Sequence, residues 1–189
     1  MKNGMNGKRY RNLYKSLTKT DPYTGKETRV YKYTGKYYRL TAEKRLVNAV
    51  CRRMLLCVCL FWIGFIAGGF INAPGSHSIW VLPFFLFSVF PGFYAVMAVW
   101  HLFRLPAYIT DPQKKGSLDS VKNSAWGIVI LSALALVGSL VVLITRAASG
   151  RETEELIFIG FGILRLFAGW GMLRKVSGLP YEEAIPPSN

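Results

Sequence analysis

Long apolar segments separated by polar connections divide the chain. The first, residues 54–71 (MLLCVCLFWIGFIAGGFI), has 18 residues without a charged or amide side chain. A helix of that length covers about 27 Å, close to the hydrocarbon thickness of a bilayer. Two arginines, Arg52 and Arg53, precede the segment and the turn-forming sequence Asn72-Ala73-Pro74 follows it. We therefore interpret residues 54–71 as a transmembrane span.

Three further segments have the same character. Residues 79–100 and 124–145 each contain 22 residues without a charge, and residues 156–173 contain a single charge, Arg165. Uninterrupted apolar segments of this length are typical of transmembrane helices. The pattern predicts an all-α membrane protein with four transmembrane helices. Apolar residues at helical spacing before the first span predict that its helix begins near Thr41, and turn signals predict a loop at 101–123.

The segment before the first helix has a different pattern of residues. Short β-prone runs at 14–20, 29–33 and 36–40 alternate with turn-forming residues. They predict a β-hairpin or a three-stranded meander. With Thr34-Gly35 as a two-residue turn, Tyr33 would pair with Lys36 and Tyr31 with Tyr38. We accordingly divide the chain into a tail with a β-hairpin (1–40), a four-helix transmembrane domain (41–175) and a short C-terminal tail (176–189).

Charge determines the expected orientation. The chain has a formal net charge of +14, and 15 of its 24 Lys and Arg residues precede residue 54. An N-terminus in the cytoplasm leaves 21 of them inside and two, Arg146 and Arg151, outside, with Arg165 in a span. The positive-inside rule then predicts that both termini are cytoplasmic. We expect a multi-pass protein of a bacterial-type plasma (inner) membrane.

The basic, tyrosine-rich tail allows three readings. Its cations can lie against anionic lipid headgroups, its strands can dock a soluble partner, or it can bind nucleic acid. We rank them in that order for the charge, prefer the partner for the hairpin, and place nucleic acid last. The candidate contact residues surround the predicted turn: Tyr31, Lys32, Tyr33, Lys36, Tyr37, Tyr38 and Arg39.

Candidate chemistry is sparse. Cys51, Cys57 and Cys59 share one predicted helix, and residues 57 and 59 are about 200° apart on it, so the three sulfurs cannot converge. All ten acidic residues are assigned to tails or loops, which argues against an intramembrane carboxylate site. No nucleotide-binding or zinc motif is present. We expect no catalytic residue, metal or cofactor, and rank an intramembrane enzyme last.

Small residues and one proline mark the packing of the spans. Pro91-Gly92 interrupts the second span and frees the carbonyl of Phe87, which predicts a kink. Gly64 and Gly68 in the first span allow close helix approach and are expected to be packing contacts.

Arg165 is the main functional candidate. A charge near the centre of a span costs about 2.5 to 3.5 kcal/mol on insertion scales, so it needs compensation. The helical wheel gives its face two glycines, Gly162 and Gly169. The candidate compensating groups are the carbonyl of Phe87, the hydroxyls of Ser88, Tyr94 or Ser132, a lipid phosphate, and an acid on another protein. We expect Arg165 to face the bundle or a subunit interface, as an assembly contact or an anion-attracting group.

These features together favour a non-catalytic membrane subunit of a larger assembly, with its basic module docking a soluble partner or anionic lipid. The alternative is a small channel or transporter made by oligomerisation, because one four-helix bundle leaves little room for a substrate path. Both readings predict a homo-oligomer or a complex with other membrane or cytoplasmic proteins.

Overall fold

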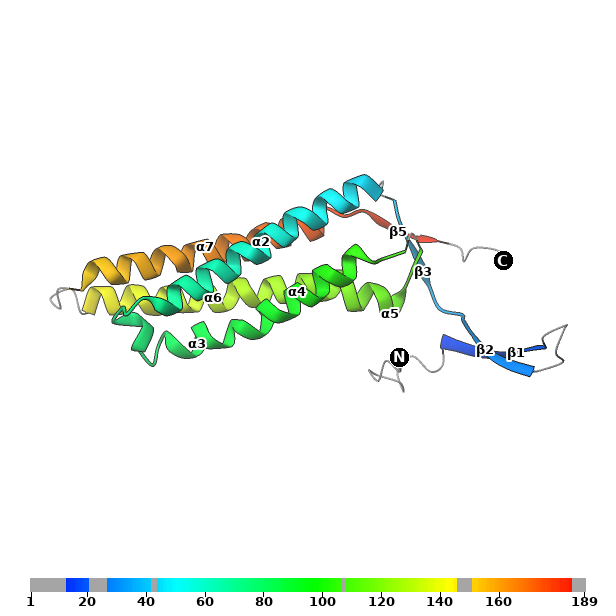
Figure 1. Cartoon of the computed structure of the whole chain (residues 1–189), viewed down its shortest axis with the longest axis horizontal. Helices are drawn as coiled ribbons and strands as arrows, with labels where there is room; N and C mark the ends of the chain where they lie inside the picture. The colour runs from blue at the N-terminus through cyan, green and yellow to red at the C-terminus, as the bar shows by residue number, and fades with distance from the viewer. Residues whose placement is uncertain (1–12, 21–26, 42–43, 107, 146–150, 185–189) are drawn as a thin grey trace.

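Four long helices lie side by side in an elongated bundle (Figure 1). The computed structural model describes residues 13–20, 27–41, 44–106, 108–145 and 151–184. Within these ranges the spans are formed by the following helices: α2 (Lys44–Phe70), α3 (Leu82–Phe87) with α4 (Val89–Phe103), α6 (Ser120–Thr145) and α7 (Glu152–Ser177). All four spans are long and apolar enough to cross a membrane. The predicted multi-pass, four-helix architecture is confirmed.

The helices form a closed ring. Helix α2 packs against α4 and α7, and α6 packs against the same two helices. At one end, which we call the sheet end, lie strands β3 and β5 (Figure 1). At the opposite end, the η2 end, a single helical turn, η2 (Gly75–His77), follows α2. Large apolar side chains cover the outside of the ring, as contact with lipid requires.

The interior of the ring contains two apolar clusters. The larger lies toward the sheet end and includes Met54 and Phe61 of α2 and Ile128 of α6. The smaller lies toward the η2 end and includes Phe85 and Phe158. Each of the four spans contributes to both clusters or packs against both, the second span through α3 on one side and α4 on the other, so the boundary between the clusters crosses all four spans.

Helix α6 begins earlier in the chain than predicted. Strand β4 (Tyr108–Thr110) leads into α5 (Asp111–Lys114) and then a π-helical turn, η3 (Lys115–Asp119), without a break before α6. The predicted loop at 101–123 is therefore wrong beyond Thr110. Asp111-Pro112 starts a helix because proline fits its first turn, and Thr110 and Gln113 form a capping box.

The tail contains the predicted strands, but they pair differently. Strands β1 (Tyr14–Thr20) and β2 (Glu27–Tyr33) form an antiparallel hairpin whose register joins Tyr14 to Tyr33. Thr34-Gly35 is not a hairpin turn, and the predicted pairs of Tyr33 with Lys36 and Tyr31 with Tyr38 are wrong. Strand β3 (Tyr37–Leu40) instead joins a second sheet, because distant parts of the chain supply it with two partners.

That second sheet has the order β4-β3-β5, with β3 central and both neighbours antiparallel. Strand β5 (Tyr181–Ala184) follows α7, and β4 follows α4. The register joins Tyr38 to Ile109 on one side and to Glu183 on the other. Three separate connections are thereby fastened together at the sheet end.

Candidate functional site

Arg165 lies inside the bundle, in the middle of α7. Its side chain is 1% exposed and is the largest of the fully buried side chains. Gly162 and Gly169, which the helical wheel places on the face of Arg165, are buried, as are Phe158 and Ala168 of the same helix. Within this single chain, the guanidinium cannot reach lipid or an acid on another protein without rearrangement of the helices around it.

Arg165 belongs to a layer that separates the two apolar clusters. We call this the polar layer and define it as Gly64 of α2, Ser88 between α3 and α4, Ser132 of α6 and Arg165 of α7. All four residues are buried. On α6, for example, Ile128 belongs to the larger cluster and Ala135 to the smaller one, with Ser132 between them. Each of the four spans contributes one residue to the layer.

The register of α6 against α7 puts Ser132 at the depth of Arg165. A Cβ atom at Gly169 would lie 2.8 Å from a methyl carbon of Ile128, and one at Gly162 would lie 2.6 Å from Leu136. Arg165 is four residues from Gly169 and three from Gly162, and Ser132 is four residues from both Ile128 and Leu136. The two polar residues are therefore at the same level of the bundle.

An aromatic ring covers the guanidinium. The Cζ atom of Arg165 is 4.5 Å from the ring centroid of Phe85, a cation–π contact. Phe85 in turn stacks on Phe65, with centroids 4.6 Å apart, and lies 5.6 Å from Phe158. The charge is held in an aromatic environment rather than beside a carboxylate.

Gly64 makes room for the arginine side chain. A Cβ atom at this position would lie 3.0 Å from Cγ of Arg165 and 3.2 Å from the carbonyl oxygen of Phe161. Gly68, one turn further along α2, faces Phe85 and Phe161. Both glycines thus lie at the contact between α2 and its neighbours, as helix packing requires.

The donors of Arg165 lack acceptors. Nε and Nη1 are buried, and neither has a hydrogen-bond partner among the described residues. Neither nitrogen is paired with any of the predicted compensating groups of this chain within the described residues. The hydroxyl of Ser88 donates to the carbonyl of Phe85 at 2.5 Å. Tyr94 is 68% exposed on the outer surface. The hydroxyl of Ser132 is buried and also without a partner.

The second span is interrupted three residues before Pro91. Helix α3 ends at Phe87 and α4 begins at Val89, so the interruption is at Ser88. Proline has no N–H to donate to the carbonyl four residues earlier, which is that of Phe87. Gly92 continues the helix by donating to the carbonyl of Ser88 at 3.2 Å, and a Cβ atom there would overlap the ring of Phe61.

Glu155 is a buried charge that the sequence analysis assigned to a loop. It lies in the first turn of α7 and is 1% exposed. Its Oε2 accepts a hydrogen bond from the backbone N–H of Gly75 at 2.6 Å, which ties η2 to α7. Glu155 lies three residues before Phe158, which lies four before Gly162, so helical spacing places Glu155 on the same face of α7 as Arg165. This spacing could have predicted from the sequence that Glu155 is buried.

Most of the predicted partner-contact residues are engaged within the chain. Tyr33 is buried, with burial as the main cause that raises the pKa of its hydroxyl. Tyr37 and Tyr38 are half-buried, and Lys36 forms an ion pair with Glu183 at 2.7 Å. Three contact candidates remain. Arg39 lies over the ring of Tyr108, and Tyr31 is 67% exposed. The side chain of Lys32 lies outside the described residues.

A cation–π cluster fastens the sheet to the bundle. Nζ of Lys114 in α5 is 4.3 Å from the ring centroid of Tyr38 and 4.1 Å from that of Tyr181. The cluster joins β3, β5 and α5. It explains why aromatic and basic side chains alternate in this part of the sequence without all of them facing outward.

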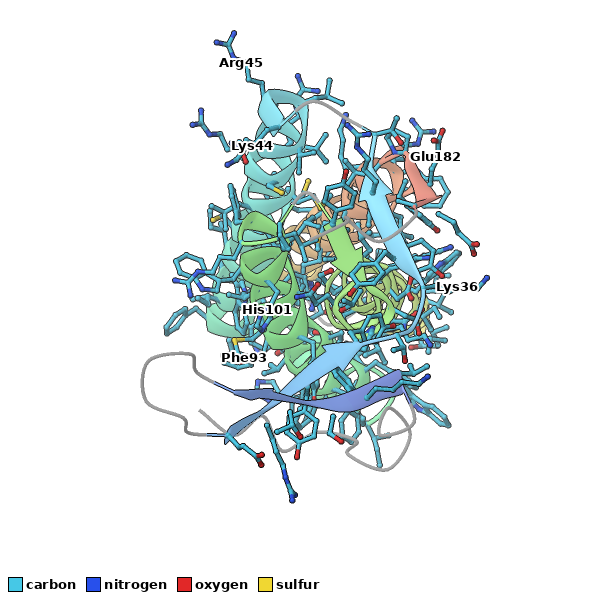
Figure 2. The ribbon with its side chains drawn as sticks, turned by 90° about the vertical axis from the view of Figure 1, so that its right-hand side faces the viewer. Lys36, Lys44, Arg45, Phe93, His101 and Glu182 are labelled. Atoms are coloured by element: carbon cyan, nitrogen blue, oxygen red, sulfur yellow. The ribbon has the colours of Figure 1, made fainter. Side chains whose placement is uncertain are left out.

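A basic patch lies at the start of α2, where the sequence analysis proposed no site. It consists of Arg45, Asn48, Ala49, Arg52 and Arg53. These positions follow helical spacing and share one face. Figure 2 shows Arg45 and Lys44 projecting away from the bundle at this end of α2. The patch is suited to an anionic group.

The residues that suggest metal or thiol chemistry do not come together. Within the described ranges, no group of three His, Cys, Asp or Glu side chains could hold a metal ion. Cys51 is buried, Cys57 half-buried and Cys59 exposed, and all three are free thiols.

Comparisons with protein-family models, curated proteins and solved structures find no match to this chain.

Proposed function

We propose that the chain is a non-catalytic, multi-pass subunit of a larger membrane assembly. In this proposal it resides in a bacterial-type inner membrane with both termini in the cytoplasm. The sheet end, with the basic patch of α2 and the exposed Tyr31, then faces the cytoplasm, where it contacts a soluble partner or anionic headgroups. The observation that carries the proposal is the position of Tyr94 on the outside of the bundle.

Tyr94 presents a polar group where lipid tails would otherwise lie. It is 68% exposed and lies nine residues before Phe103, the last residue of α4, a distance of about 14 Å at 1.5 Å per residue. A tyrosine side chain is too short to bring its hydroxyl from that depth to the headgroups. Because a polar group in hydrocarbon needs a hydrogen-bond partner, this position favours contact with another protein.

The surroundings of Tyr94 support the same reading. We define the aromatic face of the second span as Phe87, Phe90, Phe93, Tyr94 and Met97, each of which is at least 58% exposed. Helix α6 differs, because most of the large side chains that it exposes are aliphatic, such as Ile130, Leu134 and Val137. Aromatic residues and methionine are enriched in protein interfaces, whereas an aliphatic face suits lipid.

Site-specific photocrosslinking in native membranes tests the proposal. A photoreactive phenylalanine analogue replaces Tyr94 in one version and Ile130 in the control, which is 51% exposed on α6, three residues from the contact between Gly127 and Pro91. We expect a defined protein adduct from position 94 and no protein adduct from position 130. Absence of a protein adduct at position 94, or equal adducts from both positions, would contradict the proposal.

The mass of the adduct separates the two readings of the assembly. A second protein of different mass supports the subunit reading. An adduct of twice the mass of this chain supports the alternative, an oligomeric channel or transporter, in which the aromatic faces of several copies meet. That alternative is favoured by one observation, the charged polar layer at mid-depth, which a transport path could use.

A further inference from the structure

The polar layer contains a positive charge without a counter-charge. The only buried carboxylate among the described residues is that of Glu155, ten residues or about 15 Å further along α7. It already accepts the N–H of Gly75. The ion pairs formed by the described residues do not include Arg165. A guanidinium at this depth is therefore left with its full charge in apolar surroundings.

The unpartnered groups of the layer can all act as donors. Two guanidinium nitrogens of Arg165 and the hydroxyl of Ser132 are buried without partners. Two other helical hydroxyls donate to the carbonyl four residues earlier, that of Thr145 to Val141 at 2.8 Å and that of Ser117 to Gln113 at 2.7 Å. The hydroxyl of Ser132 makes no such bond and remains available to a group in the interior.

From this arrangement we propose that the polar layer binds one small monovalent anion of the halide class, held by Arg165 and Ser132. Such an ion neutralises the guanidinium and accepts hydrogen bonds from several donors at once. The proposal goes beyond the subunit function and does not depend on it, because the layer is formed within a single chain.

The surroundings select the class of anion. The ring of Phe85 covers one face of the guanidinium, so an anion approaches the edge of the group, where the N–H bonds point. Phosphate and sulfate carry more charge and more acceptor oxygens than these three donors can satisfy. Their transfer into an apolar interior is correspondingly more costly. A halide needs fewer donors and has no directional acceptor geometry.

Chloride binding to the full-length chain in detergent tests the proposal. The protein is kept in sodium gluconate and titrated with sodium chloride at constant ionic strength, while broadening of the chloride NMR signal is measured. We expect saturable broadening that bromide reverses and that sulfate does not. Absence of saturable broadening, or equal reversal by sulfate, would overturn the proposal.

Two serines of α6 provide matched variants. Ser132→Ala removes a proposed ligand, and Ser139→Ala removes another buried, unpartnered hydroxyl two turns or about 10 Å away. Because a hydrogen bond to a charged group contributes about 1.5 kcal/mol or more, we expect Ser132→Ala to weaken chloride binding about tenfold. Ser139→Ala should leave it unchanged. Equal effects of the two substitutions would refute the assignment of Ser132.

Arg165→Leu provides the stronger variant. We expect it to insert into membranes at least as well as the original chain, because the cost of a central charge is removed. It should abolish saturable chloride binding. Retained binding would overturn the proposal, and helical content measured by circular dichroism establishes that the variant is folded. If this variant does not fold, the comparison of Ser132→Ala with Ser139→Ala tests whether the anion binds in the polar layer.

Discussion

Glu155 and Arg165 are buried to the same extent on one helix, yet they differ in the hydrogen-bond partners of their side chains. Both are 1% exposed. Glu155 lies in the first turn of α7, where its Oε2 accepts the backbone N–H of Gly75 and its Oε1 has no partner among the described residues. Arg165 lies at mid-helix, and neither its Nε nor its Nη1 has a partner among those residues. A loop can offer backbone groups to a charge, whereas most backbone groups of the helices around Arg165 pair within those helices, the carbonyl of Phe87 being an exception because of Pro91. Depth in the bundle therefore decides what can compensate a charge.

The helix itself adds to this difference. The first turn of a helix has unpaired N–H groups and a partial positive charge, which favours a carboxylate such as Glu155. The middle of a helix offers neither of these to a cation. Arg165 must consequently depend on side chains, on the ring of Phe85, or on a bound anion.

The largest expected effect follows from removing the carboxylate that has a partner. Glu155→Ala leaves the buried N–H of Gly75 without an acceptor, and we expect a loss of about 3 kcal/mol in the free energy of unfolding. Glu155→Gln keeps an acceptor oxygen and should lose about half as much. Denaturant unfolding in detergent, followed by circular dichroism, measures both.

Glu152→Ala is the control for this measurement. Glu152 is exposed in the same first turn, so its removal changes the helix-end charge without affecting a buried partner. We expect a loss below about 1 kcal/mol. If Glu155→Ala were no more destabilising than this control, the contact with η2 would have no stabilising role.

A smaller effect is expected when Arg165 is crowded. Gly64→Ala introduces a Cβ atom 3.0 Å from Cγ of Arg165 and should destabilise by about 1 to 2 kcal/mol. Gly160→Ala is the matched control on α7, because a Cβ atom there meets nothing within 4 Å. We expect that control to be neutral or slightly stabilising in the same denaturant assay.

A double variant shows whether crowding acts through the arginine. Arg165→Ala removes the Cγ atom, so adding Gly64→Ala to it should cost less than adding Gly64→Ala to the original chain. The two substitutions are then non-additive. Additive losses would mean that the carbonyl of Phe161, 3.2 Å from the new Cβ atom, accounts for the strain.

The spans could be predicted from the sequence because a membrane helix leaves a local pattern. The strand pairing could not. The runs at 14–20 and 29–33 became β1 and β2, but the run at 36–40 pairs with segments some 70 and 145 residues away. No local pattern records a pairing of that separation. The turn assigned to Thr34-Gly35 failed for this reason.

At the candidate site, too, some features could be predicted from the sequence and others could not. Burial of Arg165 followed from its span and its helical face. The environment of its guanidinium did not, because the contact with Phe85 depends on how α3 packs against α7. The role of Glu155 depends on the position of the loop that contains Gly75. The free hydroxyl of Ser132 is a property of its rotamer, which the sequence does not specify.

The smallest expected effect concerns a charge that is neither buried nor central. Nζ of Lys36 is 2.7 Å from Oε1 of Glu183, and both side chains are exposed. The hydrogen bond to Glu183 raises the pKa of Lys36 above its ordinary value of 10.5. A raised pKa means that the pair stabilises the folded sheet fully below pH 10.5. The contribution is lost as the pH rises through the higher, folded-state value.

A spin label on β5 can detect this loss. With Glu182→Cys labelled, we expect label mobility to increase above pH 10.5 in the original chain as β5 loosens from β3. Lys36→Met lacks the pair and retains every tyrosine of the sheet, so its pH dependence isolates the contribution of Lys36. The difference should be small and should shrink in high salt, because exposed pairs are well screened. Identical pH profiles for the two proteins would show that cation–π contacts at Lys114 and backbone pairing alone hold β5 in place.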